Sequence, residues 1–231
     1  MASIRFNQIA DARGSVNGTV YSRGIGGLYM KNRVSPLNPQ SSKQSAVRSQ
    51  LSSLAAAWRS LTDSQRNAWK GQVDNYPATN RLGETYTPSG YQLYMTLNSN
   101  LNAVNATNLN SPLAPASFSD NKIESLTIEL TAGVISTGTL SLGETNTSDE
   151  KSIVEMTGAL SAGVSSPSQG LFRRVLVSAG SVDEYDISTV YAAQFGTPPV
   201  GARVFARCVR VLASTGQRQI LGTTSFVVTS A

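Results

Sequence analysis

The stretch RVFARCVRVLASTGQRQILGTTSFVVT, residues 203–229, contains two apolar runs rich in β-branched residues. Residues 203–213 and 219–229 predict two strands, and the polar residues 214–217 (STGQ) predict a tight hairpin connection between them. Similar runs bounded by turn residues precede this hairpin, at residues 123–134, 139–142, 153–157 and 171–178. Six to seven strands in about 110 residues predict a small antiparallel sandwich. Residues 121–231 therefore form a predicted β-sandwich module.

One segment of this module has a different pattern. Residues 186–196, DISTVYAAQFG, lack the alternation of a strand. Asp186 is a residue type that caps helix N-termini, and Gly196 is typical of the position just after a helix ends. We expect a short helix capped by Asp186 and ended by Gly196.

The hydrophobic period changes from two to about 3.6 in residues 41–105. From Ser41 onward, apolar side chains recur at steps of four, three, four and three, at Val47, Leu51, Leu54, Trp58 and Leu61. This spacing predicts one helix with a single apolar stripe, which needs a partner surface.

Two further helices are predicted in the same region. TDSQ at residues 62–65 has the form of a capping box, so a second helix should run over residues 63–76 and end before Pro77. It should bury Trp69, and we expect Trp58 and Trp69 to pack in the core. A third helix begins near Pro88 and Ser89 and carries one apolar side, formed by Leu93, Leu97, Leu101 and Val104. Three short helices form a thin core, so their remaining apolar faces should be covered by the N-terminal arm, the C-terminal region or another chain.

The first 40 residues have a third pattern. They contain five glycines and alternate apolar and polar residues before Pro36 and Pro39. Short strands or an extended arm are compatible with this composition, whereas a helix is not. Residues 106–120 are polar and contain proline, which is typical of a linker. Together with Asn105 they read NATNLNSPLAPASFSD. The predicted class is α+β, with an extended Gly/Arg-rich arm (1–40), a helical region (41–105), a linker (106–120) and an immunoglobulin- or fibronectin-like sandwich (121–231).

Composition restricts the function. The chain has 231 residues, a net charge of +5 and only 14% charged residues. Residues 1–62 hold eight Lys or Arg against Asp11 alone. No apolar run is long enough to cross a membrane, and the opening MASIRFNQIADARG lacks the apolar stretch of a secretory signal. We expect assembly in a reducing host cytoplasm and no membrane partner.

Catalytic and metal signatures are missing from the sequence. There is no histidine, which removes Ser-His and Cys-His nucleophile systems, and the one cysteine, Cys208, cannot form an internal disulfide or a thiolate metal cluster. Acidic residues in 145–150 and 181–186 could offer oxygen ligands, but such runs are more typical of solvated turns. The glycines of residues 23–27 (RGIGG) lack the Lys-Ser/Thr that a phosphate loop requires. We predict no catalytic residue, no metal site, no cofactor and no enzyme.

The arm is the predicted contact region. Its cations and aromatic rings resemble the mixture that binds single-stranded nucleic acid, although five charges over thirty residues are sparse for that role. We therefore expect protein contacts to neighbouring subunits, with nucleic acid as the less favoured partner. The predicted arm residues are Arg5, Arg13, Tyr21, Arg23, Tyr29, Lys31 and Arg33, and the predicted helical packing or interface residues are Val47, Leu51, Leu54, Trp58 and Trp69.

Several stretches resemble uncharacterised proteins encoded by tailed bacteriophages and prophages. They are LSSLAAAWRSLTDSQRNAW (51–69), with its W-x-x-L-T-x-x-Q-R-x-x-W pattern, NRLGETYTPSGYQLYMTLNSNL (80–101) and SPLNPQSS (35–42). YAAQFGTPPVGARVFARCVRVLASTGQ (191–217) is similar to a fibronectin-like or immunoglobulin-like module. The resemblance implies a virion or phage-assembly protein, and it carries over no reaction.

The leading hypothesis is a non-enzymatic structural component of a bacteriophage virion, head-associated as a decoration or minor capsid protein. Its partners would be other virion proteins and copies of itself, contacted through the arm. The alternatives are a tail or head-tail connector protein, and a nucleic-acid-binding packaging or scaffold protein that uses the basic arm. A carbohydrate-binding virion module is a further possibility, with Tyr185 and Tyr191 as stacking platforms.

Overall fold

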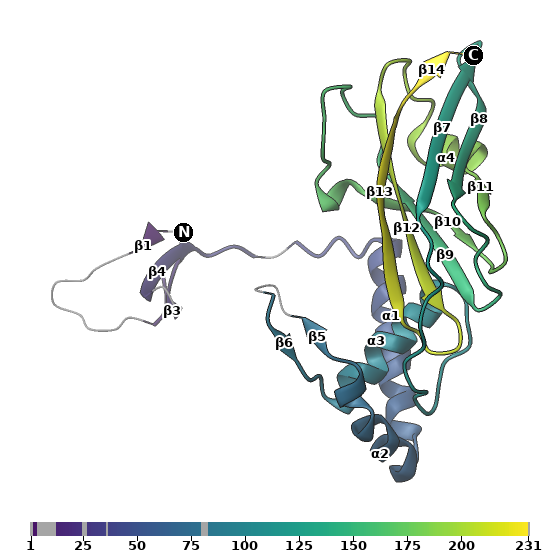
Figure 1. Cartoon of the computed structure of the whole chain (residues 1–231). Helices are drawn as coiled ribbons and strands as arrows, with labels where there is room; N and C mark the ends of the chain where they lie inside the picture. The colour runs from purple at the N-terminus through teal and green to yellow at the C-terminus, as the bar shows by residue number, and fades with distance from the viewer. Residues whose placement is uncertain (1, 4–12, 25–26, 36, 80–82, 231) are drawn as a thin grey trace. The chain divides into compact units, whose positions relative to one another are not determined.

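The computed structural model describes residues 2–3, 13–24, 27–35, 37–79 and 83–230 (Figure 1). The chain divides into two compact units, Met1–Ala46 and Val47–Ala231, which we call unit 1 and unit 2. Helix α1, Ser42–Ser60, begins in unit 1 and continues in unit 2. The predicted boundary after residue 40 therefore lies close to the observed division.

Unit 1 contains a four-stranded antiparallel sheet in the order β1-β4-β3-β2. The β2–β3 turn is Asn17-Gly18, and both residues have positive φ, 43° and 81°. Asn-Gly is the pair that a two-residue hairpin of this kind favours, so the local sequence sets the register. Short strands, one of the two alternatives left by the sequence, thus describe residues 14–32. The strands are β1 Ala2–Ser3, β2 Gly14–Val16, β3 Thr19–Gly24 and β4 Gly27–Asn32.

Helices α2 and α3 begin where their caps predict. In the capping box of α2, the Gln65 N–H donates to Thr62 Oγ1 at 3.3 Å, and the Thr62 N–H donates to Gln65 Oε1 at 2.9 Å. Ser89 and Gln92 form a second capping box at the start of α3. These pairs satisfy backbone donors that the first helical turn leaves without a partner. The elements are α2 Asp63–Gly71, the 3-10 helix η1 Val73–Asn75, the short hairpin β5 Ala78–Thr79 and β6 Thr85–Tyr86, and α3 Gly90–Ala103.

The predicted stripe of α1 is used in only one half of the helix. Leu54 and Leu61 are buried in a cluster with Trp69 and three residues of α3, namely Leu93, Tyr94 and Leu97. Trp58 packs at the edge of this cluster. Val47 and Leu51, which lie two turns and one turn before Leu54, are 55% and 45% exposed. Apolar residues with the same helical spacing are therefore exposed in the first half of α1 and packed in its second half.

Two antiparallel sheets form the sandwich, in the orders β10-β9-β12-β13 and β11-β8-β7-β14 (Figure 1). Only the short β14 pairs in parallel, with β7. The chain is thus α+β with a β-sandwich, as the sequence predicts. The strands are β7 Ile123–Thr131, β8 Val134–Leu142, β9 Glu150–Met156, β10 Arg173–Ser178, β11 Glu184–Asp186, β12 Arg203–Leu212, β13 Arg218–Val227 and β14 Thr229–Ser230.

The sandwich core comes from alternating residues of both sheets. Leu126, Ile128 and Leu130 point inward from β7, and they meet residues such as Val154 of β9 and Val204 of β12 in one buried cluster. This period-two burial is what one covered face of a strand requires. Cys208 lies in the same cluster, where burial raises the pKa of its thiol to about 11, against the opposing effects of Ser152 and Arg210. Cys208 is a small apolar filler, as expected.

Several boundaries of the predicted elements differ in the structure. The predicted second helix, residues 63–76, ends at Gly71, a residue type of low helix propensity, and Val73–Asn75 form the 3-10 helix η1. Residues 123–134 are not one strand, because Ala132 and Gly133 form the β7–β8 turn with φ values of 51° and 78°. Alanine rarely adopts a positive φ, so the residue types did not indicate this turn. The short helix α4 spans Ser188–Phe195 with Ile187, not Asp186, at its N-cap. Asp186 accepts the Ser188 N–H at 2.9 Å from just outside the helix.

Residues 106–120 do not behave as a linker between separate domains. The buried Asn98 of α3 accepts the Leu109 N–H at 2.7 Å, and the Ala116 N–H donates to Gln217 Oε1 at 2.8 Å. Val104, at the end of α3, also packs with valines of β12 in a small buried cluster. The segment connects the helices to the sandwich along its length, because its polar groups find partners on both. The helical region and the sandwich therefore form one compact unit.

Candidate functional site

The predicted arm residues lie on a small sheet with two different faces. In the β3–β4 register, Tyr21 is opposite Met30, and Ser22 is opposite Tyr29. Directly paired residues share a face, and successive residues alternate between faces. Tyr21 and Arg23 therefore share one face with Met30, whereas Tyr29 and Lys31 lie on the other. The structure does not gather all the predicted arm residues into one patch.

The remaining predicted arm residues flank this sheet. Arg13 directly precedes β2 and Arg33 directly follows β4, and both are exposed. Arg5 lies outside the described residues. The described basic groups thus lie on both faces of the sheet and beside the ends of β2 and β4.

In unit 1, no side chain is buried among residues 13–23, 29–35 and 37–46, whose side chains the structure describes. Tyr21 and Tyr29 are half-buried, and Val16 and Met30 are 65% and 38% exposed. Exposed apolar side chains are also found further along the chain, at Val34 and Leu37 in unit 1 and at Val47 and Leu51 in the part of α1 that belongs to unit 2. Folded monomers cover most of their large apolar side chains, so this series marks a candidate contact surface.

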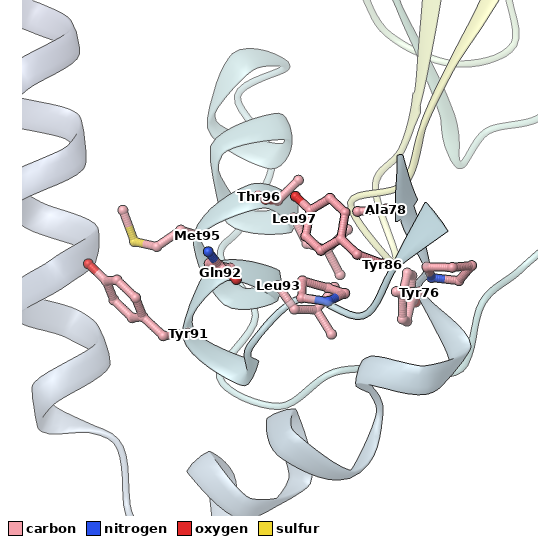
Figure 2. Close-up of a pocket in the computed structure, with 11 residues that line it drawn as sticks. Tyr76, Ala78, Tyr86, Tyr91, Gln92, Leu93, Met95, Thr96 and Leu97 are labelled. Carbon is pink, nitrogen blue, oxygen red and sulfur yellow. The ribbon is translucent and has the colours of Figure 1, made fainter. Parts of the chain in front are cut away.

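A second candidate surface is a tyrosine-lined groove in unit 2. It encloses about 410 Å³ between the β5–β6 hairpin and α3. Figure 2 shows Tyr76 and Tyr86 on one side of α3 and Tyr91 and Met95 on the other, with Gln92 and Leu93 between them. Pro77 and Pro88 add apolar ring surface to the lining. Aromatic and proline surface with few charges is typical of a site that binds an apolar or proline-rich segment.

The groove rests on a rigid aromatic base. The Trp58 ring lies 5.6 Å from Tyr91 and 5.1 Å from Tyr94, and Trp69 meets Tyr94 edge-on at 5.3 Å. The Tyr76 hydroxyl donates to the Leu113 carbonyl at 2.9 Å, and burial raises the pKa of this phenol. Because these contacts fix the tyrosines in place, the groove is preformed.

The predicted helical residues divide into core residues, one half-buried residue and exposed residues. Leu54 and Trp69 are core, with exposed fractions of 1% and 0%, so Trp69 is no surface anchor. Trp58 is half-buried and supports the groove through Tyr91. Val47 and Leu51 remain exposed and available for a partner. Whether these residues contact another protein stays a prediction.

A buried ion pair is the strongest electrostatic feature of unit 2. Arg210 Nη1 lies 3.2 Å from Glu150 Oε1, and their side chains are 0% and 1% exposed. Ser119 bonds to both residues: its N–H donates to Glu150 at 2.7 Å, and its carbonyl accepts from Arg210 at 2.6 Å. Burial opposes ionisation of Glu150, but the hydrogen bonds from Ser119 and Thr147 and the charge of Arg210 outweigh it and lower its pKa. The pair holds the end of the 106–120 segment on the sandwich.

The other acidic and aromatic candidates have structural roles. Asp149 accepts the Ser214 N–H at 2.8 Å, and Asp183 accepts the Thr145 hydroxyl at 3.1 Å. Within the part of the chain that the structure describes, no three acidic or cysteine side chains converge as a metal site would require. Tyr185 and Tyr191 are each 1% exposed, and burial raises both pKa values to about 12. They cannot serve as carbohydrate-stacking platforms, because a sugar could not reach their rings.

Two features were missed by sequence reasoning. The tyrosines and prolines of the groove come from residues 76–78, 86–88 and 91–97, which no local period connects. The proximity of two prolines and three tyrosines in this region was the only signal available. The Arg210–Glu150 pair had no local signal, because Glu150 belongs to the acidic run 145–150, which is typical of a solvated turn, and Arg210 lies on a distant, mainly apolar strand.

Comparison with known proteins adds no relative: the chain has no match among family models, curated proteins or solved structures. The resemblance to phage proteins therefore stays a prediction. Among the described residues, every helix falls short of the length and apolar character that crossing a membrane requires.

Proposed function

We propose that this protein is a non-enzymatic structural component of a bacteriophage virion that makes inter-subunit contacts through residues 1–46. The preferred role is that of a head-associated protein, either a decoration protein or a minor capsid protein. Unit 2 would then be the module that the assembly carries or displays. The proposal rests on the contrast between a sandwich with a buried core and a sheet in which none of the described side chains is buried.

The observation that carries it is the exposure of unit 1. A sheet needs an apolar face packed on something else for independent stability. None of the described side chains of residues 13–46 is buried, and Val34 and Leu37 are 76% and 91% exposed. Fully burying such a side chain is worth about 1.5–3 kcal/mol. A partner subunit that covers several of them would supply the stabilisation that the chain does not supply to itself.

The chemistry of unit 2 favours a structural role as well. Its buried polar groups are committed to hydrogen bonds that join segments, as in the Arg210–Glu150 pair. The polar cluster around this pair has no opening to solvent, since both side chains are almost completely buried. A buried polar network of this kind rigidifies a module.

The test is removal of the arm in the phage or prophage that encodes the protein. A chain lacking residues 1–40 should fold, because unit 2 contains its own cores. We expect this variant to be absent from purified particles while the full chain is present, as measured by mass spectrometry. Incorporation of the truncated chain at the normal level would refute the proposed role of the arm.

Nucleic-acid binding by the basic arm is the second candidate, because Tyr21 and Arg23 lie on one face of the sheet and Tyr29 and Lys31 on the other. Such pairs can stack on bases and neutralise phosphates. Fluorescence anisotropy with single-stranded DNA tests it. Binding that survives about 0.3 M salt would favour this second role, since non-specific phosphate contacts weaken steeply with salt.

A further inference from the structure

We propose that the tyrosine-lined groove of one chain binds the proline-containing segment SPLNP, residues 35–39, of a second copy of this chain. The inference rests on the proposed function and deepens it, because it names one of the contacts between subunits. Four observations lead to it: a repeat in the sequence, the way the chain binds its own copy of that repeat, the charges beside the groove, and the limited reach of the segment.

The repeat is short and specific. SPLNP at residues 35–39 recurs as SPLAP at residues 111–115. In both segments two prolines are three residues apart, which is the spacing of one polyproline II turn. Proline fixes φ near −65°, and the residue before it also favours extended backbone. The sequences of both segments therefore favour the same extended form.

The second segment shows how this chain holds such a sequence. Trp69 Nε1 donates to the Asn110 carbonyl at 2.9 Å, and the Tyr76 hydroxyl donates to the Leu113 carbonyl at 2.9 Å. The two carbonyls are three residues apart, so aromatic donors contact one edge of the segment at the polyproline II period. Aromatic grooves recognise proline-rich segments by this combination of ring surface and donors.

The groove offers further aromatic side chains that can donate hydrogen bonds to backbone carbonyls. It shares Tyr76 with the bound SPLAP segment and adds Tyr86 and Tyr91, which are 48% and 40% exposed. Figure 2 shows Tyr86 beside Thr96 and Leu97 of α3, with its ring at the edge of the cavity. A phenol in this position presents a flat apolar face and a hydroxyl that can donate to a carbonyl. Proline rings and the side chain of a leucine are suitable occupants for a cavity of about 410 Å³.

Charge complements this assignment. SPLNP follows Lys31 and Arg33 and precedes Lys43, and residues 12–42 of the chain contain no acidic residue. Acidic residues stand on both sides of the groove lining, Asp74 just before Tyr76 and Glu84 just before β6, and both are exposed. A basic segment entering between them is attracted, which favours association and fixes its direction.

The occupant comes from another chain because the segment is tied to α1. Tyr91 of the groove contacts Trp58, which lies sixteen residues after Ser42 on α1 and so about 24 Å along the helix axis. Pro39 precedes Ser42 by three residues, which limits its reach to about 10 Å. Because about 24 Å of helix separates Ser42 from Trp58, Pro39 of one chain cannot reach Tyr91 of the same chain. A second copy has no such restriction.

The test is a complementation experiment with full-length protein in sedimentation velocity. Tyr86→Ser leaves a chain with an intact segment and a damaged groove, and the double variant Pro36→Ala/Pro39→Ala leaves an intact groove and a damaged segment. We expect the wild type to self-associate with increasing concentration, and each variant alone to do so about tenfold more weakly or less. An equimolar mixture of the two variants should recover association, because one groove and one segment remain intact between them.

Matched controls separate this contact from general loss of apolar surface. Ile220→Ser removes an apolar side chain that is 54% exposed on β13, and Pro199→Ala removes an exposed proline far along the chain. Both should associate as the wild type does. Near-ultraviolet circular dichroism and thermal unfolding should show that Tyr86→Ser remains folded, since the ring is half exposed.

Several results would overturn the proposal. They are a monomeric wild type at all concentrations, unchanged association of either variant, and a mixture that stays as dissociated as its components. A foreign proline-rich peptide that binds through Tyr86 while the wild type stays monomeric would assign the groove to another partner. If removal of residues 1–40 abolishes particle incorporation but Tyr86→Ser does not, the proposed function stands and the groove assignment is wrong.

Discussion

Unit 1 and unit 2 contrast in how their apolar residues are used. In unit 2, the buried residues of β7, β9 and β12 meet in one sealed core, and the buried Arg210 is paired with Glu150. In unit 1, the β2–β3–β4 hairpins have good turn chemistry and good register but no described side chain that is buried. Local sequence is enough to specify hairpins, whereas stability requires a second surface. The difference predicts which substitutions affect the isolated chain and which affect only its assembly.

The largest effect on the isolated chain should come from Arg210. Replacing it by methionine leaves the Glu150 carboxylate buried without its cation and removes two bonds to Ser119, at 2.7 and 2.6 Å. Breaking a buried pair in this way costs about 3–5 kcal/mol. Urea unfolding of full-length protein measures the loss.

Arg207→Met is the matched control on the same strand. Arg207 pairs with Glu155 at 2.6 Å, but the two side chains are 14% and 16% exposed. Solvent screens this pair more strongly, so we expect a loss of about 1 kcal/mol. Equal losses at the two positions would show that the Arg210 network does not hold unit 2 together.

Acid should weaken unit 2 through Glu150. Its pKa is lowered in the folded chain, so the unfolded chain binds this proton more readily. The resulting stabilisation is complete above the ordinary glutamate pKa of about 4.3 and is lost as pH falls through the lower folded value. In Glu150→Gln, this part of the pH dependence should be absent, so the two unfolding free energies should converge in acid. A gap between them that stays constant from pH 7 to pH 3 would contradict the account.

Helix α1 contains both a buried and an exposed residue of the same apolar stripe, so the effects of their substitution can be compared within one helix. Leu54→Ala should cost about 3 kcal/mol, because Leu54 is 1% exposed and its removal leaves a cavity. Val47→Ala on the same stripe should change stability by less than about 0.5 kcal/mol, because Val47 is 55% exposed. Chemical unfolding of the monomer measures both. A large loss for Val47→Ala in dilute monomer would mean that this half of α1 is already covered.

A smaller effect is expected where α3 meets the β12–β13 hairpin. Gly216 has φ 76°, and a Cβ there would lie 2.6 Å from the Leu97 carbonyl oxygen. Gly216→Ala should cost about 2 kcal/mol, from the unfavourable φ and the contact with backbone. Gly201→Ala shares the positive φ, 84°, but a Cβ there meets nothing within 4 Å. It should cost about 1 kcal/mol. Equal decreases in melting temperature for the two variants would show that the close approach of Gly216 to the Leu97 carbonyl does not affect stability.

The elements of this fold were largely predictable, but their contacts were not. The capping box at Thr62, the stripe of α1 and the hairpin at residues 214–217 are local signals, and local signals survive in the structure. The β7–β8 turn was missed because Ala132 adopts a positive φ that its side chain does not favour. Residues 106–120 looked like a linker because the partner of Leu109, Asn98, lies on the preceding helix, where its role has no local signal.

The candidate surfaces show the same limit. A stripe of apolar residues predicted α1, yet nothing in the stripe distinguishes the buried Leu54 from the exposed Val47, since that depends on what packs on each turn. The groove required the β5–β6 hairpin to fold over α3, which no single period encodes. The arm residues were selected by type, and the sheet register then divided them between two faces.

The most direct test of the central claim is hydrogen exchange on the full-length protein as a dilute monomer. Unit 1 should acquire its stability only on another subunit, so the amides of β3 and β4 should exchange orders of magnitude faster than those of β12. They should become protected at concentrations or in particles where the chain associates. Protection of β3 and β4 in the monomer equal to that of β12 would contradict the account.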